Sequence, residues 1–204
     1  MFQSFLPFDG SVFQWVVNVF HPGAGSFWDA FFKGVTVLGN GGWFWIALAV
    51  LFLLFKKTRR IGMVMAFALL LNGLIVNAAL KPLLARPRPF LLDLPDWAAR
   101  YGAWFPQGPL VSASEYSFPS GHAAVSFAGA MAWCFASRKK WGDKARWVSY
   151  IAIALAGVIA FSRVFIGVHY MTDILAGAIM GTLCAVLGYL AFCPLERRFP
   201  KVWN

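Results

Sequence analysis

Apolar runs of about twenty residues recur along this chain and constrain its fold more than any other feature. The clearest cover residues 61–80, 147–168 and 174–193, and a fourth covers residues 117–137. A helix rises about 1.5 Å per residue, so each run can cross a hydrocarbon core roughly 30 Å thick. Because 60% of the residues are apolar and only 13% are charged, the composition excludes an ordinary soluble domain. The sequence predicts one polytopic membrane domain of the all-α class.

Two shorter apolar runs precede these four. Residues 27–38 and 43–55 flank the turn sequence Gly39-Asn40-Gly41-Gly42, and we expect them to form a helical hairpin. The bundle would then hold about six transmembrane helices. The N-terminal stretch mixes aromatic and polar side chains and lacks the features of a signal peptide, so an interfacial segment is expected there. Residues 1–204 are predicted to form this single domain. Its parts are the interfacial segment (1–22), the helical hairpin (23–60), the catalytic helices with the long outer loop (61–193) and a cytoplasmic tail (194–204).

The formal charge of +10 comes largely from short basic clusters between the apolar runs. This distribution is typical of topology signals, so no nucleic-acid partner is expected. The positive-inside rule places these clusters, and with six helices both chain termini, in the cytoplasm. The connection between residues 81 and 118 and the turn near His169 would then face outward. The dense clusters are Lys56, Lys57, Arg59 and Arg60; Arg138, Lys139, Lys140, Lys144 and Arg146; and Arg197, Arg198 and Lys201.

Three groups of polar side chains are predicted to meet at this outer face. They offer cationic side chains, a helix N-terminus, two histidines and one carboxylate, which is what a phosphoryl group needs for charge compensation and attack. A helix N-terminus also presents free N–H groups to an anion. The groups are Lys81 with Arg86-Pro87-Arg88-Pro89; Pro119-Ser120-Gly121-His122; and Ser162-Arg163 with His169 and Asp173.

His169 and Asp173 are spaced as neighbours on one helical turn. The carboxylate can accept one ring N–H of His169 and leave the other nitrogen bare as a nucleophile, and His122 is then free to act as proton donor. Two histidines and a carboxylate could instead bind a metal ion. Four nearby positive charges would oppose a divalent cation, so we expect no metal and no other cofactor.

These motifs are recognisable as a set. In order and spacing, the chain resembles the type-2 phosphatidic acid phosphatase superfamily of integral membrane lipid phosphatases, which is related to the vanadium haloperoxidases. The resemblance implies that His169 is the nucleophile, Asp173 orients it, and His122 protonates the leaving group. It also implies that phosphate is bound by five residues, namely Lys81, Arg88, Ser120, Gly121 and Arg163. Arg86 lies outside the family pattern, and its role is open.

The expected activity is metal-independent hydrolysis of a lipid phosphate or pyrophosphate through a phosphohistidine. Undecaprenyl pyrophosphate is favoured, with phosphatidylglycerol phosphate and phosphatidic acid as alternatives. Transfer of the phosphoryl group to another lipid by the same histidine is a second hypothesis, and vanadate-dependent halide oxidation a third that the hydropathy argues against. The expected location is the cytoplasmic membrane of a bacterium, with the site facing the periplasm or the exterior. The expected partners are the lipid substrate and the bilayer, and the sequence does not predict an oligomeric state.

Overall fold

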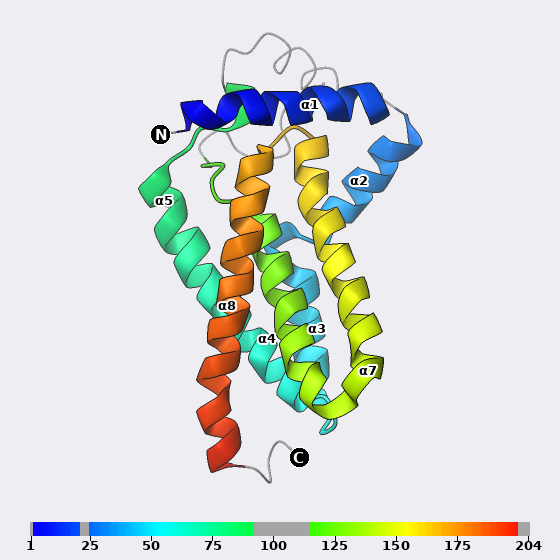
Figure 1. Cartoon of the computed structure of the whole chain (residues 1–204), viewed down its shortest axis with the longest axis vertical. Helices are drawn as coiled ribbons and strands as arrows, with labels where there is room; N and C mark the ends of the chain where they lie inside the picture. The colour runs from blue at the N-terminus through cyan, green and yellow to red at the C-terminus, as the bar shows by residue number, and fades with distance from the viewer. Residues whose placement is uncertain (1, 21–24, 92–114, 200–204) are drawn as a thin grey trace.

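A computed structural model describes residues 2–20, 25–91 and 115–199 of the chain, with residues 138–146 described in backbone only. Every regular element in these ranges is helical, which confirms the all-α class. Figure 1 shows long helices packed side by side, with α1 lying across one end of the bundle. The elements in chain order are η1 (Gln3–Phe5), α1 (Leu6–Phe20), α2 (Phe27–Val37), η2 (Asn40–Gly42), α3 (Trp43–Leu54), α4 (Arg59–Asn72), the π-helical η3 (Gly73–Leu80), α5 (Lys81–Leu84), η4 (Pro89–Leu91), α7 (Gly121–Phe165) and α8 (Met171–Arg198).

Three helical segments are individually long and apolar enough to cross a bilayer. They are Arg59–Leu91, Trp147–Phe165 and Met171–Arg198. The bent pair α2 and α3 passes the same test as a unit and gives a fourth candidate. The chain is therefore an integral membrane helical bundle, whereas the expected number of six crossings is not confirmed.

Helix α7 consists of two antiparallel arms. The hydroxyl oxygens of Ser137 and Ser149 lie 3.4 Å apart, although twelve residues of straight helix would separate them by about 18 Å. Figure 1 shows the arms meeting at the end of the bundle opposite α1. The first arm begins at Gly121, four residues later than the apolar run predicts, because Ser120 is the N-cap and its side chain accepts a hydrogen bond from the backbone of Ala123.

The predicted hairpin in residues 23–60 is wrong. Helices α2 and α3 differ in direction by 44°, whereas a hairpin would reverse the chain. Gly41 and Gly42 adopt left-handed φ angles of 57° and 72° within the connecting turn, and this turn bends the span instead of closing it back. With α2 and α3 counted as one bent span, helix α1 and the C-terminal end of α8 lie at opposite ends of the bundle (Figure 1). The expectation that both termini share one side is not confirmed.

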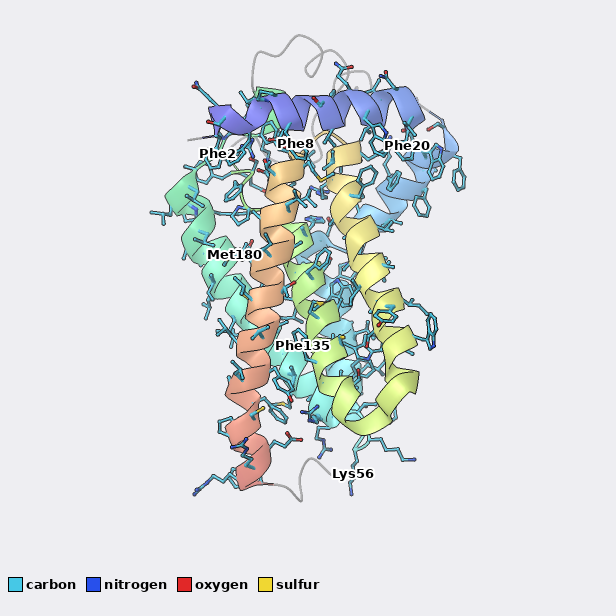
Figure 2. The ribbon with its side chains drawn as sticks, in the orientation of Figure 1. Phe2, Phe8, Phe20, Lys56, Phe135 and Met180 are labelled. Carbon is cyan, nitrogen blue, oxygen red and sulfur yellow. The ribbon has the colours of Figure 1, made fainter. Side chains whose placement is uncertain are left out.

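The two ends of the bundle differ in chemistry. Figure 2 shows Phe2, Phe8 and Phe20 at the end of the bundle where α1 lies, and Lys56 at the other end. Arg197 and Arg198 occupy the last turn of α8, which ends on the same side as Lys56 (Figure 2). The described basic clusters therefore gather at one end of the molecule, as the topology argument expects.

Two glycines allow α8 to pack closely against the first arm of α7. A Cβ atom at Gly177 would lie 2.6 Å from the carbonyl oxygen of Ser120, and one at Gly181 would overlap the backbone of Ala124. The glycine pair thus serves packing within the chain, as in other small-residue helix contacts. This contact fixes the beginning of α8 beside the beginning of α7.

Candidate active site

The imidazole of His169 and the carboxylate of Asp173 form a hydrogen-bonded pair where α8 begins. Nδ1 of His169 lies 3.2 Å from Oδ2 of Asp173, and both side chains are buried. The same Oδ2 accepts the backbone N–H of Tyr170 at 3.1 Å. A carboxylate partner at Nδ1 places the ring proton there, so Nε2 carries the lone pair. The structure thus brings together two of the residues that the sequence singles out for catalysis.

Arg88 lies on the other side of the His169 ring. Its Nη1 is 3.3 Å from Nε2 of His169 and donates to the carbonyl oxygen of Val168 at 3.0 Å. Burial, together with the positive charges of Arg88, Arg163 and Lys81, holds the pKa of His169 well below its usual value of 6.5. The imidazole is therefore neutral at physiological pH, which is the form that a nucleophile requires.

His169 lines a cavity of about 280 Å³. Six of the eight residues predicted from the sequence line it directly. Gly121 is the first residue of α7 and belongs to the cavity wall. As a glycine it has no side chain that would fill the space. The complete described lining is Gly39, Gly41, Gly42, Asn77, Lys81, Arg88, Glu115, Gly121, His122, Val125, Arg163 and His169.

The other two predicted residues lie behind the wall. Ser120 is fully buried and caps α7, and its backbone N–H donates to the carbonyl oxygen of Asp173 at 3.0 Å. Asp173 is also fully buried and reaches the cavity only through His169. Neither side chain is among the described residues that line the cavity. Their positions suit a role in orienting the residues that do.

The end of α2 and the turn after it supply two polar contacts that no sequence pattern predicts. Oγ1 of Thr36 accepts a hydrogen bond from Arg163 at 2.8 Å, and Oδ1 of Asn40 lies 2.9 Å from Nε2 of His122. A Cβ atom at Gly39 would lie 2.5 Å from the His122 ring, so glycine is required there. The turn sequence predicts a hairpin, whereas in the structure its glycines form part of the cavity wall.

Arg86 faces away from the cavity. Its Nη1 donates to Oδ1 of Asp173 at 2.5 Å, and its Nη2 donates to Oδ2 of Asp9 at 2.9 Å. Asp9 comes from α1 and is buried. A single acidic residue in an N-terminal segment carries no sequence signal for this contact, so the sequence does not predict it.

The acidic residues near the site are paired with arginines. Within the part of the chain that the structure describes, no three His, Cys, Asp or Glu side chains gather as a metal-binding group. Glu115 at the cavity wall is instead bound to Arg88, with Oε2 3.0 Å from Nη2. The described cavity is chiefly cationic, which suits an anionic ligand. The cavity thus places a neutral imidazole, which can act as a nucleophile, beside cationic groups that can neutralise a bound anion.

Comparison with known proteins gives a consistent result. The model of the PAP2 superfamily matches residues 61–194. Undecaprenyl-diphosphatase of Sulfolobus acidocaldarius is 29% identical over 143 residues, covering 70% of this chain and 61% of that protein. Lipid A 4'-phosphatase of Bacteroides thetaiotaomicron is 31% identical over 177 residues, covering 84% of this chain and 73% of that protein. The chain thus spans about two thirds of the length of these relatives.

A solved structure extends the similarity to the N-terminal helices. The PAP2-type phosphatidylglycerolphosphate phosphatase of Bacillus subtilis aligns with a TM-score of 0.71 at 25% identity. The alignment covers 97% of this chain and 90% of that one. The shared fold therefore includes the described helices outside residues 61–194.

Proposed function

The chain belongs to the PAP2 superfamily, and from this premise we propose that it hydrolyses a lipid phosphate or lipid pyrophosphate through a phosphohistidine. The observation that carries the proposal is the placement of His169. Its Nδ1 is bound to Asp173, its Nε2 lies 3.3 Å from Nη1 of Arg88, and the residue lines a cavity together with Lys81, Arg88 and Arg163. Cationic groups around an unprotonated nitrogen lower the cost of bringing a nucleophile up to a negatively charged phosphorus centre.

The first step of the proposed reaction transfers the phosphoryl group to the protein. Nε2 of His169 attacks phosphorus, and the bond from phosphorus to the lipid oxygen breaks. His122, which we propose takes up a proton when the anionic substrate binds, gives that proton to the departing oxygen and becomes neutral. The Nδ1 proton stays between His169 and Asp173, whose negative charge stabilises the positively charged phosphoimidazole ring.

The second step releases phosphate. His122, now neutral, takes a proton from water while the water oxygen attacks phosphorus. The bond between phosphorus and Nε2 breaks, and His169 returns to its neutral form with inorganic phosphate as product. Lys81, Arg88, Arg163 and the N–H groups at Gly121 are proposed to hold the phosphate oxygens through both steps.

A second, apolar hollow is the observation that favours a lipid as the substrate. It lies between α3 and α4, has a volume of about 280 Å³ and is lined only by aliphatic side chains among the described residues. Ile46 in this hollow follows Gly42 in the cavity wall by about one helical turn. A headgroup in the cavity could thus leave its hydrocarbon chain along these two helices. The lining is Ile46, Ala49, Val50, Leu53, Ala66, Leu69 and Leu70.

Within the lipid phosphates, we favour a polyprenyl pyrophosphate as the substrate, in agreement with the name of the archaeal relative. The test is phosphate release by detergent-purified protein from undecaprenyl pyrophosphate, phosphatidylglycerol phosphate, phosphatidic acid and lipid A, with EDTA in every reaction. We expect release from lipid substrates, fastest from the pyrophosphate, and none from the His169→Ala variant. Transfer of label to a second lipid without free phosphate would indicate a transferase, and activity that requires added Mg²⁺ would overturn the metal-independent mechanism.

We propose that the site faces the outside of a bacterial cytoplasmic membrane, because the described basic clusters lie at the opposite end of the bundle. Single cysteines in a background without the three native ones report this orientation. A cysteine at Gln3 should react with an impermeant thiol reagent from outside, and one at Lys56 should not. The reverse labelling pattern would place the site in the cytoplasm.

A further inference from the structure

We propose that Asp9 and Arg86 are positioning residues for the reaction, and that α1 is thereby a functional part of the site. Both residues are buried, and neither is among the described residues that line the cavity. Arg86 belongs to the same Arg-Pro-Arg-Pro segment as Arg88 but faces the opposite side of His169. The proposal rests on the phosphohistidine chemistry proposed above.

The contacts form a chain from α1 to the nucleophile. Asp9 accepts a hydrogen bond from Arg86 at 2.9 Å, Arg86 donates to Asp173 at 2.5 Å, and Asp173 lies 3.2 Å from His169. Asp173 uses Oδ1 for the guanidinium and Oδ2 for the imidazole. Because its two oxygens are held from different sides, the carboxylate cannot rotate without losing a charge-assisted hydrogen bond.

Thr172 closes this arrangement into a ring. Its hydroxyl accepts from Arg86 and donates to Asp9, both at 2.8 Å, and its backbone N–H donates to the other oxygen of Asp9 at 2.9 Å. The guanidinium also lies over the ring of Tyr170, 3.7 Å from its centroid. The contacts therefore connect α1 and the Arg-Pro-Arg-Pro segment to the first turn of α8, where Asp173 is located.

The charges explain why two carboxylates share one guanidinium. If Arg86 were paired with Asp173 alone, its positive charge would offset the negative charge that Asp173 presents to His169. Asp9 binds the same guanidinium and so offsets part of that positive charge. Asp173 then keeps negative charge directed at Nδ1, where it stabilises the ring when Nε2 is phosphorylated. Removing Asp9 should consequently slow the chemical step while leaving the cavity that binds phosphate unchanged.

The test measures kcat and KM separately for Asp9→Asn in the full-length protein. A misplaced group near a reaction centre can cost up to about 100-fold in rate, and we expect kcat to fall roughly 10-fold with KM within about twofold of wild type. Asp29→Asn is the matched control, because Asp29 is a buried N-terminal carboxylate on α2 outside the contacts described above. It should retain wild-type kcat.

A double-mutant cycle separates positioning from simple loss of packing. Arg86→Gln should lower kcat by about 100-fold. The double variant with Asp9→Asn should lose no more than Arg86→Gln alone, because Arg86 is the one of the two Asp9 partners described above whose side chain contacts the Asp173 carboxylate. Where Arg86→Gln does not fold, Thr172→Val takes its place in the cycle. Losses that multiply, an effect confined to KM, or unchanged kcat in Asp9→Asn would each overturn the proposal. A wild-type protein that turns over no lipid phosphate would instead overturn the function on which it rests.

Discussion

Two buried arginines hold the opposite ends of this bundle and differ in what surrounds them. At the end away from the cavity, Arg60 of α4 donates to Glu196 of α8 at 2.8 Å and to the carbonyl oxygen of Ala136. At the cavity end, Arg86 donates to Asp173 and Asp9. Both connect elements that are distant in the sequence, yet only Arg86 contacts a residue bonded to His169.

The comparison teaches that burial and charge alone do not mark function in this molecule. Arg60 has one carboxylate partner at the end of α8 and lies 5.5 Å from the ring centroid of Tyr189. With its bond to Ala136, it connects α4, α7 and α8. Arg86 joins a chain of polar contacts that ends at an uncharged imidazole facing a cavity. We therefore expect substitutions at the cavity end to change rates and substitutions at the other end to change stability.

The largest effect on rate short of removing the nucleophile is expected from Asp173→Asn. The amide can no longer hold the Nδ1 proton in place, and such a change in tautomer control can cost about 10⁴-fold in kcat. The measurement is steady-state phosphate release, with the folded state checked by thermal denaturation in detergent. A variant that keeps more than about a tenth of wild-type kcat would remove Asp173 from the proposed mechanism.

His122→Ala should produce a smaller effect that depends on the substrate. General acid catalysis is worth about 10²- to 10⁴-fold, and it matters most when the leaving group is a poorly stabilised lipid alkoxide. Hydrolysis of phosphatidic acid should therefore nearly vanish, while hydrolysis of a pyrophosphate, whose leaving group is a lipid monophosphate, should fall modestly. Equal losses on both substrates would indicate that His122 binds phosphate and does not donate the proton.

The pH dependence of kcat/KM tests the environment of His169. Because burial and neighbouring cations lower the pKa of this imidazole well below 6.5, it stays neutral and nucleophilic as the pH falls through that value. After correction for titration of the substrate phosphate, kcat/KM should not decline with a pKa of 6.5 on the acidic side. If kcat/KM did decline with a pKa of 6.5 that arises from the protein and not from the substrate, the imidazole would not be held in the proposed surroundings.

Arg60→Gln should have the smallest effect on rate and so sharpens the comparison between the two ends. Loss of the guanidinium removes its 2.8 Å contact with Glu196, and a hydrogen bond between charged groups is worth roughly 1.5–3 kcal/mol. The midpoint of thermal unfolding should fall by several degrees, while kcat stays within about twofold of wild type. A large loss of kcat in a folded Arg60→Gln variant would show that the two ends are coupled.

The sequence predicted the helical class and most of the cavity because both depend on local patterns. Apolar runs of sufficient length indicate transmembrane helices, and the spacing of His169 and Asp173 places them on one helical turn. The bend at Gly41 and Gly42 was missed because a glycine-rich turn is equally compatible with a reversal or a bend. Only packing against His122 and Val125 distinguishes the two.

The contacts behind the cavity could not be predicted, since they join residues far apart in the chain. Asp9 and Thr172 are 163 positions apart, and no local pattern relates them. Thr36 and Asn40 likewise contact Arg163 and His122 only because α2 and α3 form a bent span. Sequence reasoning thus found residues that carry recognisable chemistry and missed those that orient them.

Trapping the phosphorylated protein tests the central claim most directly. Detergent-purified protein is mixed with a lipid phosphate labelled on its terminal phosphoryl group, in EDTA, and quenched within a single turnover. The account predicts acid-labile, base-stable label on His169 in the wild type, less rapid labelling in Asp173→Asn, and none in His169→Ala. Phosphate release by the wild type with no label on His169 at any time, or label that persists in His169→Ala, would contradict the account.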